Sequence, residues 1–231
     1  MDLDKNIQQK RGVFRAMSIE DLRKVANLPY WSDGEQTTLS YQLPLRRTPL
    51  RDGFWSLDWK RLARSKGLLK EIPQGELYEL HGYWCARSPE THIACFSEAI
   101  DFLVPVGATI FAAQKGVVVE LVESNTDWGD GPQYRDLLNY MTICHGRGHF
   151  YTDCPEEHSQ YCHIGKGTAS IAGISVGTRV EKGQVIGKVG LNGWTDRPHL
   201  HFVVLRGDND SLDNPLTWKY KSLRPRFELG R

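Results

Sequence analysis

Two histidines occur in a short stretch that alternates between polar and apolar residues, from Arg197 to Val204. Alternation of this kind predicts a β-strand, in which residues two apart project from the same face. His199 and His201 are therefore expected to lie side by side on one surface. Pro198 cannot donate a backbone hydrogen bond, so we place it at the start of the strand. The two imidazoles could serve as a metal ligand and a proton shuttle, although surface histidines on an edge strand would give the same pattern.

Further short apolar segments, separated by glycine-containing turns, follow one another from residue 77 onward. This succession of short strands and turns indicates an all-β sandwich or a barrel-like core. Strands are expected at residues 99–104, 109–113, 117–123, 138–144 and 159–164, with two shorter pieces within 176–187. The first of these strands carries Asp101 inside an apolar run. Because a buried, unpaired carboxylate is costly, Asp101 is expected to have a partner.

The first 79 residues lack this succession of short apolar segments and are predicted to be an N-terminal extension of unknown role. Ser18, followed by Glu20 and Asp21, predicts the start of one helix, because a hydroxyl cap and acidic residues stabilise the first turn. A second helix is expected over residues 57–69. Neither segment carries a chemical motif, and the basic residues of the second helix are interpreted as a solvated face.

Composition and charge exclude several classes of function. The formal net charge of the 231 residues is +1, so no nucleic-acid partner or anionic membrane surface is expected. No apolar run approaches the roughly 20 residues of a transmembrane helix. The N-terminus does not read as a secretory signal, so a cytoplasmic location is expected unless a leader has been removed. Five irregularly spaced cysteines favour reduced thiols over a disulfide framework.

One carboxylate and four histidines, dispersed over separate segments, form the candidate site: His92, Asp101, His163, His199 and His201. Such a set suits a catalytic zinc site, which uses three nitrogen or oxygen ligands and leaves a position open for water. Zinc lowers the pKa of water to about 7, so that water can attack a carbonyl at neutral pH. Histidines that do not bind zinc would orient the water and stabilise the developing charge.

The ordered motifs of this region resemble those of lysostaphin-type zinc metallopeptidases. The motifs are DFLVPVG at 101–107, AAQKGVV at 112–118, YCHI at 161–164, VEKGQVIG at 180–187 and PHLHF at 198–202. The resemblance implies a compact antiparallel β core, barrel-sandwich-like, over residues 80–220. It leaves the α-containing extension before this core and a tail of residues 221–231 after it. Members of the family mostly cut peptide cross-links in bacterial cell walls.

The resemblance also implies the roles of the site residues. Asp101 and His201 would bind zinc, and His163 and His199 would act as catalytic histidines beside the water. The usual first ligand, four residues before the aspartate, is replaced here by Ser97, which is a poor zinc ligand. Some relatives resemble this chain in carrying the histidine at a longer spacing, so His92 is expected to take this place. On a straight strand His92 would lie on the face opposite Asp101, so the chain must bend between them.

Three other features were weighed as sites. Six histidines and cysteines lie close together in one segment: Cys144, His145, His149, Cys154, His158 and Cys162. They could hold a second metal, but their spacing matches no known pattern of zinc ligands. A hairpin in which these residues are incidental is therefore favoured. Trp194 could stack on substrate or simply pack. Glu98 is expected to be solvated on the face opposite Asp101.

Two functions from different classes follow. The leading hypothesis is a zinc-dependent peptidase that hydrolyses short peptide bonds, plausibly peptidoglycan cross-links. The alternative is a catalytically degenerate binding or regulatory module of the same fold, because Ser97 departs from the family pattern. A third interpretation, a biotinyl or lipoyl carrier domain, rests on residues 176–187. It fits less well, because neither Lys115 nor Lys182 has the flanking pattern of a carrier lysine.

Overall fold

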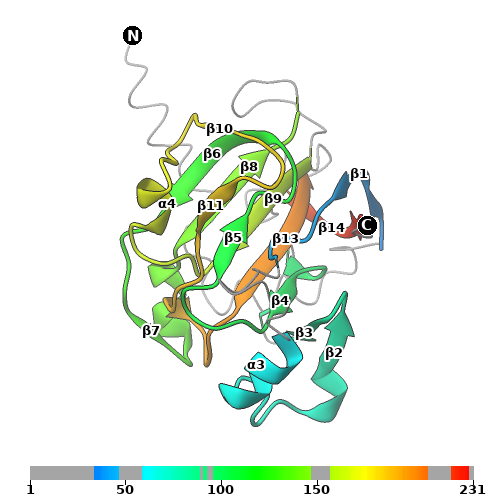
Figure 1. Ribbon diagram of the computed structural model, residues 1–231, viewed down its shortest axis with the longest axis vertical. Helices are drawn as coiled ribbons and strands as arrows, with labels where there is room; N and C mark the ends of the chain where they lie inside the picture. The colour runs from blue at the N-terminus through cyan, green and yellow to red at the C-terminus, as the bar shows by residue number, and fades with distance from the viewer. Residues whose placement is uncertain are drawn as a thin grey trace, which may run out of the picture.

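The computed structural model describes residues 34–46, 59–88, 91–92, 96–146, 157–207 and 220–228. One large sheet forms a layer of the protein (Figure 1). Its main path runs β10-β6-β8-β9-β13-β4-β3-β2, and β14, with β1 beside it, pairs with β13. The strands of this sheet are β1 (Gln36–Tyr41), β2 (Leu77–Leu80), β3 (Tyr83–Ala86), β4 (Ile100–Phe102), β6 (Gly116–Val122), β8 (Tyr140–Cys144), β9 (Glu157–Cys162), β10 (Arg179–Val180), β13 (Leu200–Gly207) and β14 (Tyr220–Phe227).

Smaller elements complete the fold. Two short sheets pair β5 (Thr109–Phe111) with β11 (Val185–Lys188) and β7 (Trp128–Gly129) with β12 (Gly193–Trp194). The described helices are α3 (Trp59–Ser65) and α4 (Thr168–Ile171), with the short 3-10 helices η1 (Gln74–Glu76) and η3 (Pro132–Leu137). The expected fold class, mainly β with antiparallel pairing, is confirmed; only the pairs β1–β14 and β7–β12 are parallel among the described strands.

Strand β13 is the centre of the arrangement. One of its edges pairs with β9 along most of its length. Its other edge is shared, since residues 200–202 pair with β4 and residues 204–207 pair with β14. The strand begins at Leu200, two residues after the start predicted at Pro198. The delay has a local reason, because Pro198 has no N–H and the Arg197 carbonyl oxygen accepts hydrogen bonds from the side chains of Thr195 and His199 instead.

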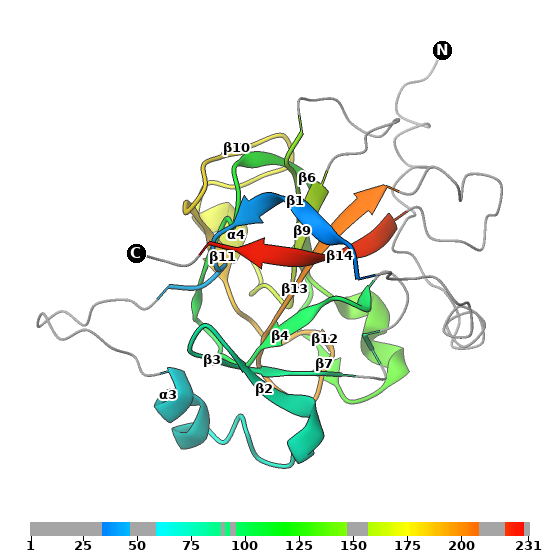
Figure 2. The ribbon, with the colours of Figure 1, turned by 90° about the vertical axis from the view of Figure 1, so that its right-hand side faces the viewer.

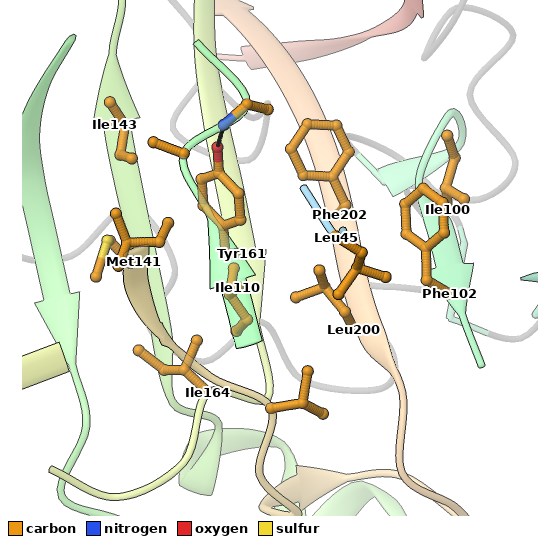
Figure 3. Packing of buried hydrophobic residues seen from close by; sticks show 14 of the residues in the cluster. Leu45, Ile100, Phe102, Ile110, Met141, Ile143, Tyr161, Ile164, Leu200 and Phe202 are labelled. Atoms are coloured by element: carbon orange, nitrogen blue, oxygen red, sulfur yellow. Dashed lines mark hydrogen bonds between the residues drawn. The ribbon is translucent and has the colours of Figure 1, made fainter. Parts of the chain in front are cut away.

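The hydrophobic core lies between the large sheet and the β5–β11 pair (Figure 3). Ile110 of β5 is completely buried there with Met141, Tyr161 and Phe202 of the large sheet. The hydroxyl of Tyr161 is not left unpaired in this apolar layer, because it accepts a hydrogen bond from the backbone N–H of Ala113 at 2.8 Å. Alternate residues of β4, β9 and β13 therefore face this core, and the residues between them face the other side.

Part of the N-terminal region belongs to the same packed body. Strand β1 lies beside β14 (Figure 2), and Tyr41 and Leu45 join the core. Buried Glu157 ties β1 to β9, since its carboxylate accepts hydrogen bonds from the N–H of Thr38 and from the hydroxyl of Tyr41. The division of the chain at residue 80 stays a prediction, and side chains from both sides of it share this core.

Helix α3 confirms the helix predicted within residues 57–69, and it packs against β3 at one end of the molecule. Its buried Ala63 forms a small separate cluster with Leu68, Ala86 and Leu103. The helix predicted at Ser18 lies outside the described residues. Within the part of the chain that the structure describes, no helix is long and apolar enough to cross a membrane.

Candidate metal centre and active site

Asp101 and His201 meet across two adjacent strands. Asp101 of β4 is directly opposite His201 of β13 in the antiparallel register, so both side chains project from the same face of the sheet. Oδ1 of Asp101 lies 2.8 Å from Nδ1 of His201. Both residues are buried. The partner that a buried carboxylate requires is therefore a histidine 100 residues away in the sequence.

His92 approaches the same carboxylate from outside the sheet. Its Nε2 lies 3.0 Å from Oδ2 of Asp101, and its side chain is only 7% exposed. A turn after β3 carries His92, because the backbone N–H of His92 donates to the carbonyl oxygen of Ser88 at 2.6 Å. The bend expected between His92 and Asp101 stays a prediction, since residues 93–95 lie outside the described residues. Despite the short distance, Nε2 of His92 makes no hydrogen bond of good geometry with any described residue.

These three residues fit a metal ion. His92, Asp101 and His201 can each offer one ligand atom, and the three atoms lie within 4.8 Å of one another. A buried imidazole nitrogen that makes no hydrogen bond can bind a metal ion when it is unprotonated. The donor set of two imidazoles and a carboxylate is one that zinc uses. No other group of three such residues was found among the described residues.

His163 enters the site through an unusual backbone conformation. It follows β9 with a φ of 61°, in the left-handed region that few residues other than glycine adopt. Its N–H bonds the carbonyl oxygen of Asn139 at 2.8 Å, and its own carbonyl oxygen accepts the N–H of Gly190 at 2.7 Å. In a regular strand, Cys162 and His163 would face opposite sides. The left-handed residue instead brings the His163 ring to 4.4 Å from the ring of His199, measured between centroids.

Backbone oxygens define which nitrogen of each of these two histidines faces the site. Nδ1 of His163 lies 2.7 Å from the carbonyl oxygen of Asn192. Nδ1 of His199 lies 3.0 Å from the carbonyl oxygen of Arg197. A carbonyl oxygen only accepts, so each Nδ1 carries the proton and each Nε2 is left for chemistry. Nε2 of His199 lies 3.5 Å from Oδ1 of Asp101.

Burial and charge tune the protonation of the site in opposite directions. Burial by itself would raise the pKa of Asp101, but the adjacent His199 and His92 and the hydrogen bond from His201 outweigh burial and hold this pKa well below its usual value. Burial, assisted by the nearby His199, lowers the pKa of His163 well below its usual value. Burial also lowers the pKa of His201, against the opposing effect of Asp101. At neutral pH the site therefore holds an ionised carboxylate and neutral His163 and His201 rings.

The other residues singled out in the sequence lie elsewhere. Ser97 does not lie on a strand with Asp101, since β4 begins at Ile100. Residues 96–99 form a turn, and the exposed Ser97 places its Oγ 2.9 Å from Oγ of Ser222 on β14. Glu98 is half-buried and its Oε2 lies 3.5 Å from Nε of Arg224, so it is not simply solvated. Trp194 is half-buried on β12, beside β7.

The histidine- and cysteine-rich segment gives no metal centre among the described residues; His149 and Cys154 lie outside them. His145 is engaged on both ring nitrogens, with Nδ1 at 2.8 Å from the carbonyl oxygen of Lys115 and Nε2 at 2.8 Å from Oγ of Ser159. The three described cysteines, Cys85, Cys144 and Cys162, form no disulfide with one another. Whether this segment holds a second metal stays a prediction.

The family model for "Peptidase family M23" matches residues 96–214, which is more than half of the chain. The chain belongs to this peptidase family. The matched segment of this M23 family member includes Asp101, His163, His199 and His201, whereas His92 lies just before it. The first of the three clustered residues is therefore the one that the family match does not cover.

Several solved structures are similar to this M23 chain, each at 22% identity. A zinc-containing peptidase from Vibrio cholerae aligns over 58% of this chain and 35% of its own, with a TM-score of 0.37. A putative peptidase M23 from Pseudomonas aeruginosa aligns over 63% and 53%, with a TM-score of 0.35. The catalytic domain of lysostaphin from Staphylococcus simulans aligns over 54% and 74%, with a TM-score of 0.34. The chain thus spans about a third to a half of the first two structures. No curated protein matches it.

Sequence reasoning missed two groups that hold the site together. Asn139 and Asn192 fix His163, and the sequence offered only the turn residues Asn192 and Gly193 as a signal. Ser88 contacts both Asp101 and the turn of His92. The signal for Ser88 was the order Ser88-Pro89-Glu90, which is typical of the first turn of a helix.

Proposed function

We propose that this M23 family member is a zinc-dependent peptidase in which His92, Asp101 and His201 hold the metal and His163 and His199 are the catalytic histidines. The observation that carries the proposal is the convergence of the three possible ligand atoms within 4.8 Å, beside two histidines that keep Nε2 for chemistry. The two sets of residues are distinct, so the proposal assigns each of them a separate role.

The ligand role of the first set rests on the chemistry of the donors. His92 offers Nε2, which is buried and lacks a hydrogen bond to any described residue. Nδ1 of His201 donates to Asp101 in this structure, and it could bind zinc once its proton has moved to Nε2. Asp101 adds the single negative charge of the set. Zinc supplies Lewis acidity, which polarises a carbonyl oxygen and lowers the pKa of water.

The role of the second set rests on tautomers. His163 and His199 are each held through Nδ1–H by a backbone carbonyl oxygen. Nε2 can then accept a proton from an attacking water or, once protonated, donate one to the amide nitrogen of the leaving group. A protonated Nε2 also stabilises the negative charge that develops on the carbonyl oxygen. Because burial favours the neutral ring of His163, this residue is suited to start the cycle as a base.

We further propose that the substrate is a peptide cross-link of the peptidoglycan type. This substrate class comes from the resemblance to lysostaphin-type peptidases. The test uses purified protein that has been stripped of metal and then reloaded with one equivalent of zinc. The reloaded protein is incubated with insoluble peptidoglycan or with soluble cross-linked peptides. The products are then separated and identified by mass spectrometry. New amino and carboxyl ends are expected with zinc, absent after chelation, and restored when zinc is added back.

A matched control removes a histidine that lies outside the site. His81 is exposed at the turn between β2 and β3 with a φ of 48°, a conformation that asparagine tolerates. His81→Asn is expected to retain full activity, whereas Asp101→Asn is expected to lose it. Zinc-loaded protein that binds peptidoglycan but cuts no peptide bond in either substrate would favour the degenerate binding module and overturn the peptidase proposal.

A further inference from the structure

Ser88 lies at the point where the turn of His92 leaves the sheet. Strand β3 pairs with β4 so that Ala86 is directly opposite Asp101, and the chain reaches Ser88 two residues later. The hydroxyl of Ser88 is 2.6 Å from Oδ2 of Asp101. A carboxylate only accepts when it is ionised, so Ser88 is the donor. The length of this bond is typical of a charge-assisted O–H···O⁻ hydrogen bond, roughly twice as strong as a neutral one.

The backbone of Ser88 acts on a second member of the site. Its carbonyl oxygen accepts the N–H of Thr91 at 2.9 Å and the N–H of His92 at 2.6 Å. These two bonds close a turn between Ser88 and His92. One residue therefore contacts Asp101 through its side chain and sets the path of His92 through its main chain.

The two oxygens of Asp101 are used by different partners. Oδ1 faces His201 at 2.8 Å and His199 at 3.5 Å. Oδ2 faces His92 at 3.0 Å and accepts the Ser88 hydroxyl. An ionised carboxylate has about four lone-pair positions, so Oδ2 can accept from Ser88 and still offer a lone pair. Rotation of the carboxylate would break the Ser88 bond, so the hydroxyl fixes its orientation between the two histidines.

The position of His92 explains why the site needs the two contacts of Ser88. His201 and Asp101 belong to paired strands, and the sheet itself holds them in register. His92 lies outside the sheet, nine residues before Asp101, and no ladder of hydrogen bonds holds it. Partners that orient metal ligands in this way typically change metal affinity by about 10- to 100-fold when they are removed.

We propose that Ser88 is a positioning residue for the metal centre: its hydroxyl orients the Asp101 carboxylate and its carbonyl oxygen anchors the turn that carries His92. This inference rests on the proposed function, since it takes His92 and Asp101 as metal ligands. Ser88 is not one of the three proposed ligands. Its loss is therefore expected to weaken metal binding without changing the number of metal ions bound.

The test measures zinc affinity by competition with a chromophoric chelator, together with the visible spectrum of the Co²⁺-loaded protein. Ser88→Ala removes the hydroxyl and keeps the carbonyl oxygen, and zinc affinity is expected to fall about 10- to 100-fold. Ser88→Thr keeps a hydroxyl on the same carbon and is expected to restore both the affinity and the Co²⁺ spectrum. Ser88→Gly also frees the backbone of the turn, so it is expected to bind zinc more weakly than Ser88→Ala.

Ser97→Ala is the matched control, because Ser97 also carries a hydroxyl near β4 but directs it to Ser222. It is expected to bind zinc as the unaltered protein does. Thermal unfolding of the metal-free variants separates a local effect from misfolding. Each variant is expected to unfold in one cooperative transition, with a lowered midpoint in Ser88→Ala and Ser88→Gly because the bond to buried Asp101 is lost. Ser88→Ala that binds zinc as tightly as the unaltered protein would overturn the role of the hydroxyl. Equal zinc affinities in Ser88→Gly and Ser88→Ala would overturn the role of the turn. Unaltered protein that binds no zinc would instead overturn the proposed function and the inference with it.

Discussion

Nδ1 of His163 donates a hydrogen bond to the backbone carbonyl oxygen of Asn192 at 2.7 Å. This bond selects the tautomer of a histidine that also has a left-handed backbone conformation. Asn192 is itself fixed, since its side-chain amide donates to the carbonyl oxygen of Ile164 at 2.7 Å and accepts the N–H of Asn139 at 2.8 Å. A network of main-chain and amide groups therefore decides which nitrogen of His163 reaches the site.

Asn192→Ala is expected to reduce kcat by about 10- to 100-fold, less than the roughly 100- to 10,000-fold contribution of an acid–base residue itself. The two lost side-chain bonds loosen the carbonyl oxygen that orients His163, while the proposed ligands are untouched. Steady-state kinetics and zinc content of the same preparation check this. Loss of zinc in Asn192→Ala would mean that the network supports the metal centre rather than the His163 tautomer.

His199→Ala and His201→Ala are expected to differ although the two residues are neighbours on one face. His199→Ala should keep about one zinc per chain and lose activity by about 100- to 10,000-fold, because it removes a group that handles protons. His201→Ala should lose zinc, because it removes a ligand. Metal analysis by mass spectrometry, alongside the peptide assay, separates the two results. Equal loss of zinc in both variants would show that the roles are assigned wrongly.

His92→Ala is expected to cost most of the zinc affinity, and Ser97→Ala almost none. A histidine at position 97 is not expected to rescue the loss, because residue 97 lies in a turn and its side chain faces Ser222 rather than Asp101. Zinc titrations of His92→Ala, of Ser97→Ala and of the double variant His92→Ala/Ser97→His check this. Tight binding that survives His92→Ala would rule out His92 as a ligand, and rescue by Ser97→His would contradict the observed turn.

Acid is expected to destabilise the fold through His145, outside the active site. Burial lowers the pKa of His145 from 6.5 to about 4, although its bond to the carbonyl oxygen of Lys115 opposes this. The folded state favours the neutral ring of His145, whereas the unfolded chain, with the higher pKa, binds the proton more readily. The stabilisation is therefore complete above about pH 6.5 and is lost as the pH falls toward 4. Between pH 7 and pH 5 the loss from this one group is about 2 kcal/mol.

Urea unfolding of the metal-free protein at pH 7 and pH 5 measures this loss. The other histidines contribute in every variant, so the quantity compared is the difference between His145→Gln and the unaltered protein. His145→Gln is expected to be less stable at pH 7 but to lose about 2 kcal/mol less on going to pH 5. His81→Asn, at an exposed turn, should show the pH dependence of the unaltered protein. The same pH dependence in His145→Gln would show that the ring is not buried as a neutral group.

The sequence alone determined the local parts of this site. Alternation about His201 and the apolar run about Asp101 predicted two strands, and the cost of burying a carboxylate predicted that Asp101 needs a partner. The spacing of His92 predicted a bend in the chain, which stays a prediction. The conclusions on the strands and on Asp101 hold because the face on which a side chain lies, and the cost of burying its charge, depend on neighbours in the sequence.

Tertiary structure decided everything that joins distant segments. The register of β4 against β13 placed Asp101 opposite His201, and no local pattern specifies which residues of two separated strands will pair. The direction of His163 depends on one left-handed residue that Asn139 and Asn192 hold from other segments. The same is true of Ser97, whose side chain turned to β14. The alternation of side chains decides on which face of a strand each residue lies. Hydrogen bonds between distant segments decide which residues of two strands lie next to each other.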